Sequence, residues 1–268
     1  MKLTVLVDNN TLIDRYYLGE PALAFYIEDG DTTLLFDTGY SDVCLRNAAL
    51  LGVDLGRVST IAISHGHVDH TGGLPWLQKA GLLQGRRLVA HPAAFYPKHD
   101  ETGNTGATVS AELLAQSCTL RLTALPTALS SHVTFLGEIP QHTPFEERRA
   151  MGAVDTPQGT QPDLVVEDTA LACTTPEGLF IVTGCSHSGI CNIIRHAQQV
   201  CGEERIAGII GGLHLFERDT RLDKTIAALK GLAIPRIYPC HCVSLAAKCS
   251  MDCCLPIQEI GVGSTILF

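Results

Sequence analysis

Alternation of apolar and polar positions predicts a series of short β-strands in the first ninety residues. These strands are expected at residues 3–7, 22–27, 33–36, 60–64 and 88–90. Gly30 and Asp31 form a turn signal between the second and third of them, which favours a hairpin. Apolar residues at helical spacing predict one helix over residues 42–51, ending at Gly52, and another beginning over residues 74–79.

The second half of the chain repeats this order of strands and helices. Strands are expected at residues 164–174, 179–183, 206–210 and 236–239, and helices at residues 190–200 and 222–230. Residues 97–117, which are polar and contain glycine, are expected to form a mobile loop or a short helix, a candidate lid. Residues 137–162 lack clear periodicity and are expected to form a second long loop. Two β-rich halves, each with helices, predict an α/β fold of the αβ/βα sandwich type, as a single domain over residues 1–268.

The composition is that of a compact globular protein, with 46% hydrophobic and 18% charged residues. The formal net charge of −9 opposes polyanions, so neither a nucleic acid nor an acidic membrane surface is expected as a partner. The first twenty residues include Asp8 and Asp14 and are too polar for a signal peptide, and no apolar stretch reaches the ~18 residues of a membrane span. We expect a cytoplasmic protein that acts on a small molecule; the sequence does not indicate its oligomeric state.

The densest group of metal-binding side chains is the segment 64–73, SHGHVDHTGG, which follows a predicted strand. It holds His65, His67, Asp69 and His70, and imidazole and carboxylate groups suit zinc, iron or manganese. In an extended chain His65 and His67 project to the same side. Asp69 and His70 follow where the chain can turn toward a second metal ion. Three histidines and an aspartate at this spacing predict a metal site.

Three more histidines, His187, His214 and His241, each follow a run of apolar residues predicted to be a strand. One histidine in such a place is commonly a hydrogen-bonded loop residue. Three such placements together indicate further ligands, which a pair of metal ions would need.

The chain has eleven cysteines, five of them between Cys240 and Cys254. Reduced thiols or metal ligands are expected rather than disulfides. The spacing C-x-C-x6-C-x3-C-C matches neither a zinc ribbon nor a ferredoxin, so we expect reduced, packed thiols. The alternative is a second centre built on Cys249, Cys253 and Cys254. At a strand end, Cys240 and Cys242 would flank His241 and point away from it.

With these features the chain resembles the metallo-β-lactamase superfamily. The resemblance is carried by H-x-H-x-D-H after a strand and by FDTG before it, and AHP, GEIP, TGCSHSGICN, IIGGLHL and PCHC extend it along nearly the whole chain. These strings are similar to a subfamily labelled 7,8-dihydropterin-6-methyl-4-(β-D-ribofuranosyl)aminobenzene-5′-phosphate synthase, or simply metal-dependent hydrolase. The resemblance implies a four-layer αβ/βα sandwich and two divalent transition-metal ions, zinc by preference, with iron or manganese as alternatives.

The resemblance also implies roles for individual residues. It assigns His65 and His67 to the first metal, Asp69, His70 and His241 to the second, and Asp37 to orienting the motif loop. Where the superfamily often has a bridging aspartate, this chain has Cys185, with His187 just beyond it. We expect His187 to be the third ligand of the first metal. His214 is either a ligand or a substrate contact.

Two such ions would activate a hydroxide for attack on a carbonyl or phosphoryl centre, with Asp69 both binding metal and orienting the nucleophile. This predicts a metal-dependent hydrolase acting on a small, anionic ester, phosphoester or lactone-like substrate. The subfamily label implies an alternative, a transferase that joins a dihydropterin methyl diphosphate to an aminobenzene ribofuranosyl phosphate. A third alternative is a di-iron or iron–sulfur redox protein.

Overall fold

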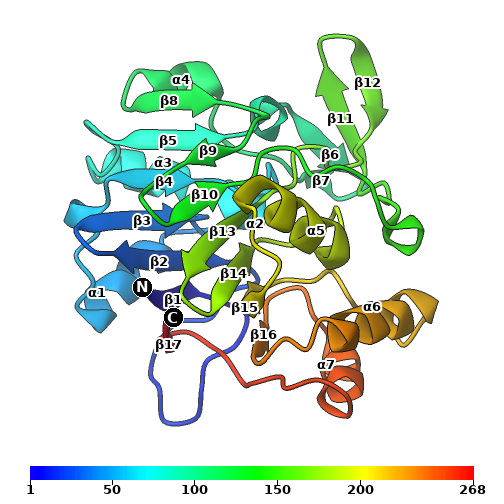
Figure 1. The fold of residues 1–268 in the computed structure, drawn as a ribbon. Helices are drawn as coiled ribbons and strands as arrows, with labels where there is room; N and C mark the ends of the chain where they lie inside the picture. Colours follow the sequence, from blue (N-terminus) through cyan, green and yellow to red (C-terminus); the bar gives the residue numbers. More distant parts are fainter.

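The computed structural model describes every residue of the chain, from 1 to 268. Two large β-sheets face each other, and helices cover their outer sides (Figure 1). The larger sheet has seven strands, in the spatial order β17 (Thr265–Leu267), β1 (Lys2–Val7), β2 (Ala24–Asp29), β3 (Thr32–Phe36), β4 (Thr60–Ala62), β5 (Arg87–Ala90) and β8 (Thr119–Leu122).

The second large sheet has six strands and is built mainly from the second half of the chain. Its order is β16 (Ile237–Pro239), β15 (Ile206–Gly211), β14 (Gly178–Thr183), β13 (Ala170–Thr175), β10 (Val133–Phe135) and β9 (Thr127–Ala128). A third, small sheet of four strands, which we call the flap, projects beside the sandwich (Figure 1). The flap consists of β12 (Gly159–Pro162), β11 (Ala153–Thr156), β6 (Lys98–Asp100) and β7 (Gly103–Asn104).

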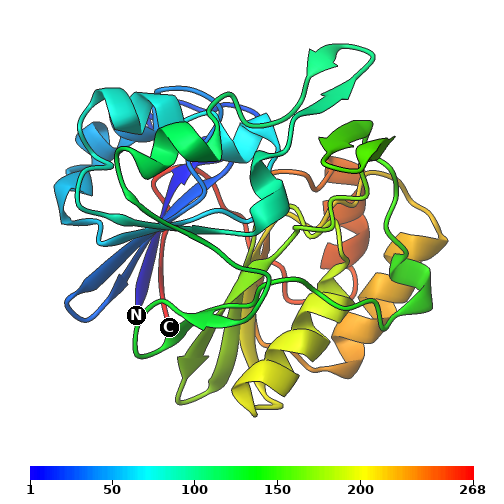
Figure 2. The same ribbon diagram turned by 90° about the horizontal axis from the view of Figure 1, so that it is seen from above.

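Amphipathic helices form the two outer layers (Figure 2). The seven-stranded sheet carries α1 (Val43–Leu51), α3 (Leu74–Lys79) and α4 (Ala111–Ala115), and the six-stranded sheet carries α5 (Ile190–Cys201), α6 (Thr220–Gly231) and α7 (Leu245–Asp252). In α5 the buried residues Ile190, Ile193, Ile194 and Ala197 recur at helical spacing, and Gly202 ends the helix in the left-handed conformation. None of the helices combines the length and apolar character needed to cross a membrane.

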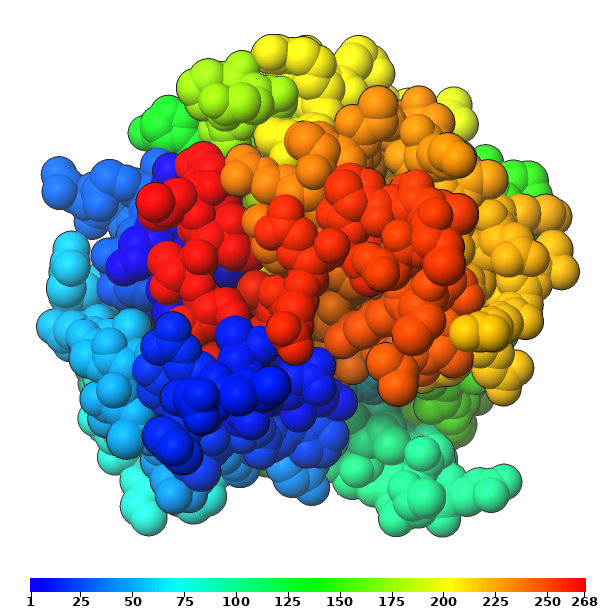
Figure 3. Space-filling model, turned by 90° about the horizontal axis from the view of Figure 1, so that it is seen from below, coloured from blue at the N-terminus to red at the C-terminus, as the bar shows by residue number.

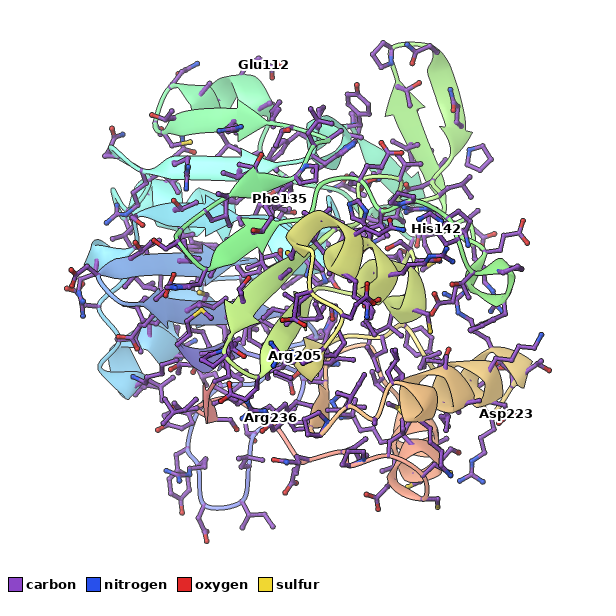
Figure 4. The ribbon with its side chains drawn as sticks, viewed as in Figure 1. Glu112, Phe135, His142, Arg205, Asp223 and Arg236 are labelled. Atoms are coloured by element: carbon purple, nitrogen blue, oxygen red, sulfur yellow. The ribbon has the colours of Figure 1, made fainter.

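A shared core joins the two large sheets. Phe25 and Phe36 from one sheet and Phe135 and Phe180 from the other belong to one buried cluster, and Phe135 lies on β10 between the layers (Figure 4). Two further apolar clusters lie under the outer helices, one for each sheet. This arrangement of helices, sheet, sheet and helices confirms the expected four-layer αβ/βα sandwich.

The chain ends lie side by side, because β17 pairs antiparallel with β1. On the face in Figure 3, the first residues of the chain (blue) lie beside its last part (orange to red). Segments far apart in the sequence therefore form one continuous surface here, and part of it borders the site described below.

Both candidate loop stretches contain more regular structure than expected, although α4 agrees with the short helix given as an alternative for the first. Residues 97–117 include β6, β7 and α4, and residues 137–162 include a 3-10 turn at Pro144–Glu146, then β11 and β12. Strand β12 is exposed throughout and β11 buries only one residue, so neither has the apolar alternation that would have predicted a strand. The strand expected from residue 164 begins only at Ala170, because residues 163–168 turn acidic side chains inward.

Candidate metal centre

The candidate site lies where parallel strands of both sheets end. Strands β3 and β4 are parallel in one sheet, and β14, β15 and β16 are parallel in the other. Every site residue expected from the sequence follows one of these strand ends. Asp37 comes after β3, the segment 64–70 after β4, Cys185 and His187 after β14, His214 after β15 and His241 after β16.

Three of these residues leave their strands in the left-handed backbone region, which residues other than glycine seldom adopt. The φ angles are 59° at Asp37, 49° at His214 and 52° at His241. Backbone N–H groups hold these turns, since Asp37 N donates to Ala62 O at 2.9 Å and His241 N donates to the Asp8 carboxylate at 2.8 Å. Strained backbone of this kind concentrates at functional sites.

His65 and His67 aim ring nitrogens at one point. Nε2 of His65 lies 3.1 Å from Nδ1 of His67. Two nitrogen ligands of one tetrahedral zinc ion, each bound at about 2.0–2.1 Å, lie about 3.3 Å apart. His187 packs against both rings, with centroids 4.8 and 5.1 Å away. Its Nε2 is buried without a protein partner, which suits a nitrogen that a metal ion would satisfy.

A second group of donors gathers around Asp69. Its carboxylate lies 3.2 Å from Nε2 of His241 and 3.5 Å from Nε2 of His70. The thiol of Cys185 lies 3.3 Å from that same His70 nitrogen. These four side chains therefore also have the spacing of ligands around a common ion.

The donors form overlapping groups rather than two separate ones. Within each group the ligand atoms lie within 4.8 Å of one another: Asp69, His70, Cys185 and His241; His65, Cys185 and His187; His65, His67 and Asp69. His65, Asp69 and Cys185 each belong to two groups, so these three residues link the groups to one another. The structure thus brings together all six residues expected as ligands and adds Cys185, whose role the sequence left open. Its only signal was its place after β14, where the superfamily often has an aspartate.

The ring nitrogens that face away from the donor groups are held by other side chains. His65 Nδ1 lies 2.9 Å from Ser64 Oγ, His70 Nδ1 2.7 Å from Asp37, His67 Nε2 3.3 Å from Asp163, and His241 Nδ1 3.0 Å from Asn9. Contacts of this kind fix the orientation and the proton position of metal-binding histidines. The donor set and its support therefore fit divalent transition-metal ions.

The carboxylate of Asp37 contacts two residues of the segment 64–70. Its fully buried carboxylate accepts hydrogen bonds from the backbone N–H and the hydroxyl of Ser64, both at 2.7 Å, and contacts His70 at 2.7 Å. The packing leaves no spare room, because a Cβ added to Gly184 would lie 2.1 Å from the Ser64 hydroxyl. These contacts place the Asp37 carboxylate where it can orient the segment 64–70.

Burial controls the charges in the site. Burial and the neighbouring histidines lower the pKa of His65 and His187 well below its ordinary value, which leaves neutral rings with a free lone pair. Burial also opposes charge on Asp69 and His70, but their attraction outweighs it. The pKa of Asp69 falls well below its ordinary value, and that of His70 rises well above its own, with Asp37 contributing. A metal ion at His70 would displace the proton held there.

Several of the donor side chains line a cleft of about 260 Å³, which Met151 and Phe216 also line. A larger groove of about 790 Å³ adjoins this cleft and shares Asn9, Phe216 and His241 with it. The groove runs between residues 9–11 and the last part of the chain, on the face shown in Figure 3. A substrate whose reacting group reaches the donors can therefore extend into the groove.

His214 belongs to none of the ligand groups. Its ring lies 4.4 Å from that of His187 and lines both the cleft and a recess of about 180 Å³ that contains Arg149 and Arg221. Burial, reinforced by Arg221, lowers the pKa of His214 to about 4. A neutral imidazole suits both roles expected for His214, metal ligand and substrate contact; its absence from the ligand groups favours the second.

Other residues of the site gave no recognisable sequence signal. Lys98, Asp163, Glu167 and Asp168 are buried next to the motif loops. The three acids lie in DLVVED, whose apolar centre predicted the start of a strand. Their contacts depend on long-range packing, which periodicity does not report.

The expected orientation of Cys242 is wrong. Cys240 points away from the site into the core between the sheets. Cys242 instead lines the cleft next to the donor groups, where its sulfur accepts a hydrogen bond from the backbone N–H of His214 at 3.3 Å. The left-handed backbone at His241 breaks the alternation of a regular strand, which was the basis of the prediction.

The alternative cysteine centre has no support in the structure. Cys249, Cys253 and Cys254 are all exposed and belong to none of the groups of three or more donors that could hold a metal ion. Cys249 lies on α7, and the Cys253 thiol donates to the Cys249 carbonyl at 3.3 Å, as expected of neighbouring turns of a helix end.

Iodoacetamide at pH 8 is expected to label Cys249, Cys253 and Cys254 in the native protein and to leave Cys44 unmodified until the protein is denatured. Cys44 is inaccessible, and burial raises the pKa of its thiol to about 12, so it carries almost no thiolate. Mass spectrometry of peptides over a time course measures the rates. Protection of the three exposed thiols by added zinc would contradict the assignment and revive a cysteine-ligated centre.

Comparison with known proteins gives one family and several related structures. The family model described as the metallo-beta-lactamase superfamily matches residues 18–182. A protein of Methanocaldococcus jannaschii named 7,8-dihydropterin-6-methyl-4-(beta-D-ribofuranosyl)-aminobenzene-5′-phosphate synthase is 29% identical over 263 residues, which covers 92% of this chain and 89% of that protein.

Two solved structures have a similar fold. One, described as a metal-dependent hydrolase of the beta-lactamase superfamily, has a TM-score of 0.85 and 28% identity and covers 100% of this chain and 99% of its own. The other is zinc-bound PqqB from Methylobacterium extorquens, with a TM-score of 0.61, 13% identity and full coverage of both chains. At that identity the second likeness concerns the fold alone.

Proposed function

Because the chain belongs to the metallo-beta-lactamase superfamily, we propose that it is a metal-dependent hydrolase with two divalent ions at the strand ends. The proposal rests on the overlapping groups of ligand atoms, in which His65, Asp69 and Cys185 are shared. Ions held in groups that share ligands lie close together, which is the arrangement of two-metal hydrolases. Zinc is the proposed metal, because it accepts histidine, carboxylate and thiolate ligands together.

The proposed ligands divide between the two ions. His65, His67 and His187 would hold the first, Asp69, His70 and His241 would hold the second, and Cys185, which shares a group with ligands of each, would offer its sulfur to either ion. When bound, the ions supply Lewis acidity toward substrate oxygen atoms and activate water for attack. Asp69 has a partly exposed side chain, at 28%, and can also orient the attacking water by accepting its hydrogen bond.

The proposed substrate is a small, anionic ester, phosphoester or lactone-like molecule. A cleft of about 260 Å³ admits its reacting group, and the groove beside the cleft admits the rest. Arg149 and Arg221 line the recess next to the cleft, where a negatively charged group would meet them. His214 lies between recess and cleft and is proposed as a substrate contact.

A second candidate reaction is a condensation, favoured by the groove of about 790 Å³ and by the related synthase. The groove is large enough for a second substrate next to the cleft. In this reaction a dihydropterin methyl diphosphate would be joined to an aminobenzene ribofuranosyl phosphate. Diphosphate would then leave from the same metal site.

An assay with zinc-loaded protein distinguishes the two reactions. One arm supplies bis(4-nitrophenyl) phosphate, butyryl homoserine lactone and an acyl thioester, and the other supplies the two condensation substrates together. We expect hydrolysis in the first arm that disappears when the metal is removed with a chelator. A joined product with release of diphosphate would favour the condensation, and no turnover in either arm would overturn both proposals.

A further inference from the structure

Lys98 is buried beside the metal site although lysine is normally exposed. Only 1% of its side chain is accessible. Its ammonium group lies 2.8 Å from the carboxylate of Asp163 and 2.9 Å from that of Glu167, and both acids are buried as well. A lysine in the interior is strongly unfavourable unless it is paired, and here two buried carboxylates supply the pairing.

Both acids of the cluster also contact the metal-binding segment. The second oxygen of the Asp163 carboxylate lies 3.3 Å from Nε2 of His67. Glu167 accepts a hydrogen bond from the backbone N–H of Gly66 at 3.2 Å. The stem of Lys98 packs directly on Gly66, where an added Cβ would lie 2.9 Å from Cε of the lysine. The cluster therefore touches both the ring and the backbone of this segment.

The contact with Asp163 bears on which nitrogen of His67 carries the proton. A neutral imidazole has one N–H and one lone pair. Nδ1 is the nitrogen that lies 3.1 Å from Nε2 of His65, so Nδ1 needs the lone pair to share a metal ion with it. Asp163 is an acceptor only, and it favours the proton on Nε2. Without Asp163, His67 would be free to adopt either tautomer.

Lys98 in turn fixes Asp163 and ties the flap to the site. Lys98 is the first residue of β6, and Asp163 follows β12 directly, so their ion pair joins the two ends of the flap. Asp163 also accepts from the backbone N–H of Val165 at 3.0 Å. With one oxygen held by Lys98 and Val165, the other is left to face His67.

We propose that Asp163 and Lys98 are positioning residues for His67: Asp163 keeps the ring proton on Nε2, and Lys98 holds Asp163 in the orientation that does so. The expected effect of these residues on metal binding rests on the proposed function, whereas their effect on the His67 ring does not. The tautomer of His67 is a property of the metal-free protein and can be measured there.

Asp163→Asn is the sharpest test, because the amide keeps the shape of the carboxylate. Its oxygen is drawn to Lys98, which leaves the NH₂ group facing Nε2 of His67 and requires a lone pair there. Nitrogen-15 NMR of the metal-free protein is expected to show His67 protonated at Nε2 in the wild type and at Nδ1 in the variant. Binding of one of two cobalt(II) ions is expected to weaken by about 10–100-fold, with a changed visible spectrum.

A matched control and a second variant complete the test. Asp29→Asn alters a similar contact between a carboxylate and a histidine ring, since Asp29 lies 2.9 Å from Nδ1 of His132. Asp29 is the last residue of β2, at the end of that strand away from the site, so this variant is expected to leave cobalt binding unchanged. Lys98→Met should weaken the same ion as Asp163→Asn; if it does not fold, Asp163→Asn still decides. An unchanged His67 tautomer with unchanged cobalt affinity in Asp163→Asn would overturn the inference. Failure of the wild type to bind cobalt would instead overturn the proposed function.

Discussion

Asp69→Ala is expected to lower the turnover of any substrate of this protein by about a thousandfold, equivalent to about 4 kcal/mol of transition-state stabilisation. Asp69 belongs to two of the three groups of ligand atoms, and its carboxylate lies 3.2 Å from His241 and 3.5 Å from His70. Its removal takes a ligand from the second ion and leaves the buried His70 with less compensating charge.

Metal content and activity should fall together in this variant while the fold is retained. Elemental analysis after equilibration with one equivalent of zinc per site is expected to show one ion or fewer per chain, and circular dichroism should match the wild type. Asp155→Ala is a suitable control, because that aspartate lies on β11 of the flap and is about half exposed. Full zinc content in Asp69→Ala would remove Asp69 from the ligand set.

Asp37→Ala is expected to cost about 3 kcal/mol of stability in the metal-free protein, which lowers its melting temperature by about 6–12 °C. The variant leaves three buried groups without their acceptor: the N–H and the hydroxyl of Ser64, and Nδ1 of His70. Unpartnered polar groups in the interior are costly because water cannot replace the lost bond.

The melting temperature of Asp37→Asn should lie between those of the wild type and Asp37→Ala, because the amide oxygen can still accept one of these hydrogen bonds. Differential scanning calorimetry of chelator-treated protein measures all three, without any contribution from bound metal. Equal melting temperatures for the wild type and Asp37→Ala would show that the carboxylate does not support the segment 64–70.

The elements with strong periodicity were predictable from the sequence. Strands β1, β2 and β3 and helix α5 lie within a few residues of their expected positions, because each buries a continuous apolar stripe. Helix α7 was missed, since cysteine, serine and alanine give it only a weak apolar face, although Ser244 caps its first turn. The flap strands were missed because they pair without burying one face.

The residues of the candidate site also fall into two kinds, those that local sequence predicts and those that only the folded chain brings together. The segment 65–70 concentrates its ligands in six residues, and His187 and His241 follow visible strands, so local sequence was enough to propose them. The ion pair between Lys98 and Asp163 joins residues 65 positions apart. Such a contact exists only once the flap has formed, and no local pattern reports it.

Diffraction from crystals grown with zinc, measured on both sides of the zinc absorption edge, tests the two-metal site most directly. We expect two anomalous peaks per chain, about 3.5–4 Å apart, one beside His65 and His67 and the other beside His70 and His241. Asp69 and Cys185 should lie between the peaks. A single peak, or peaks away from these side chains, would contradict the two-metal site.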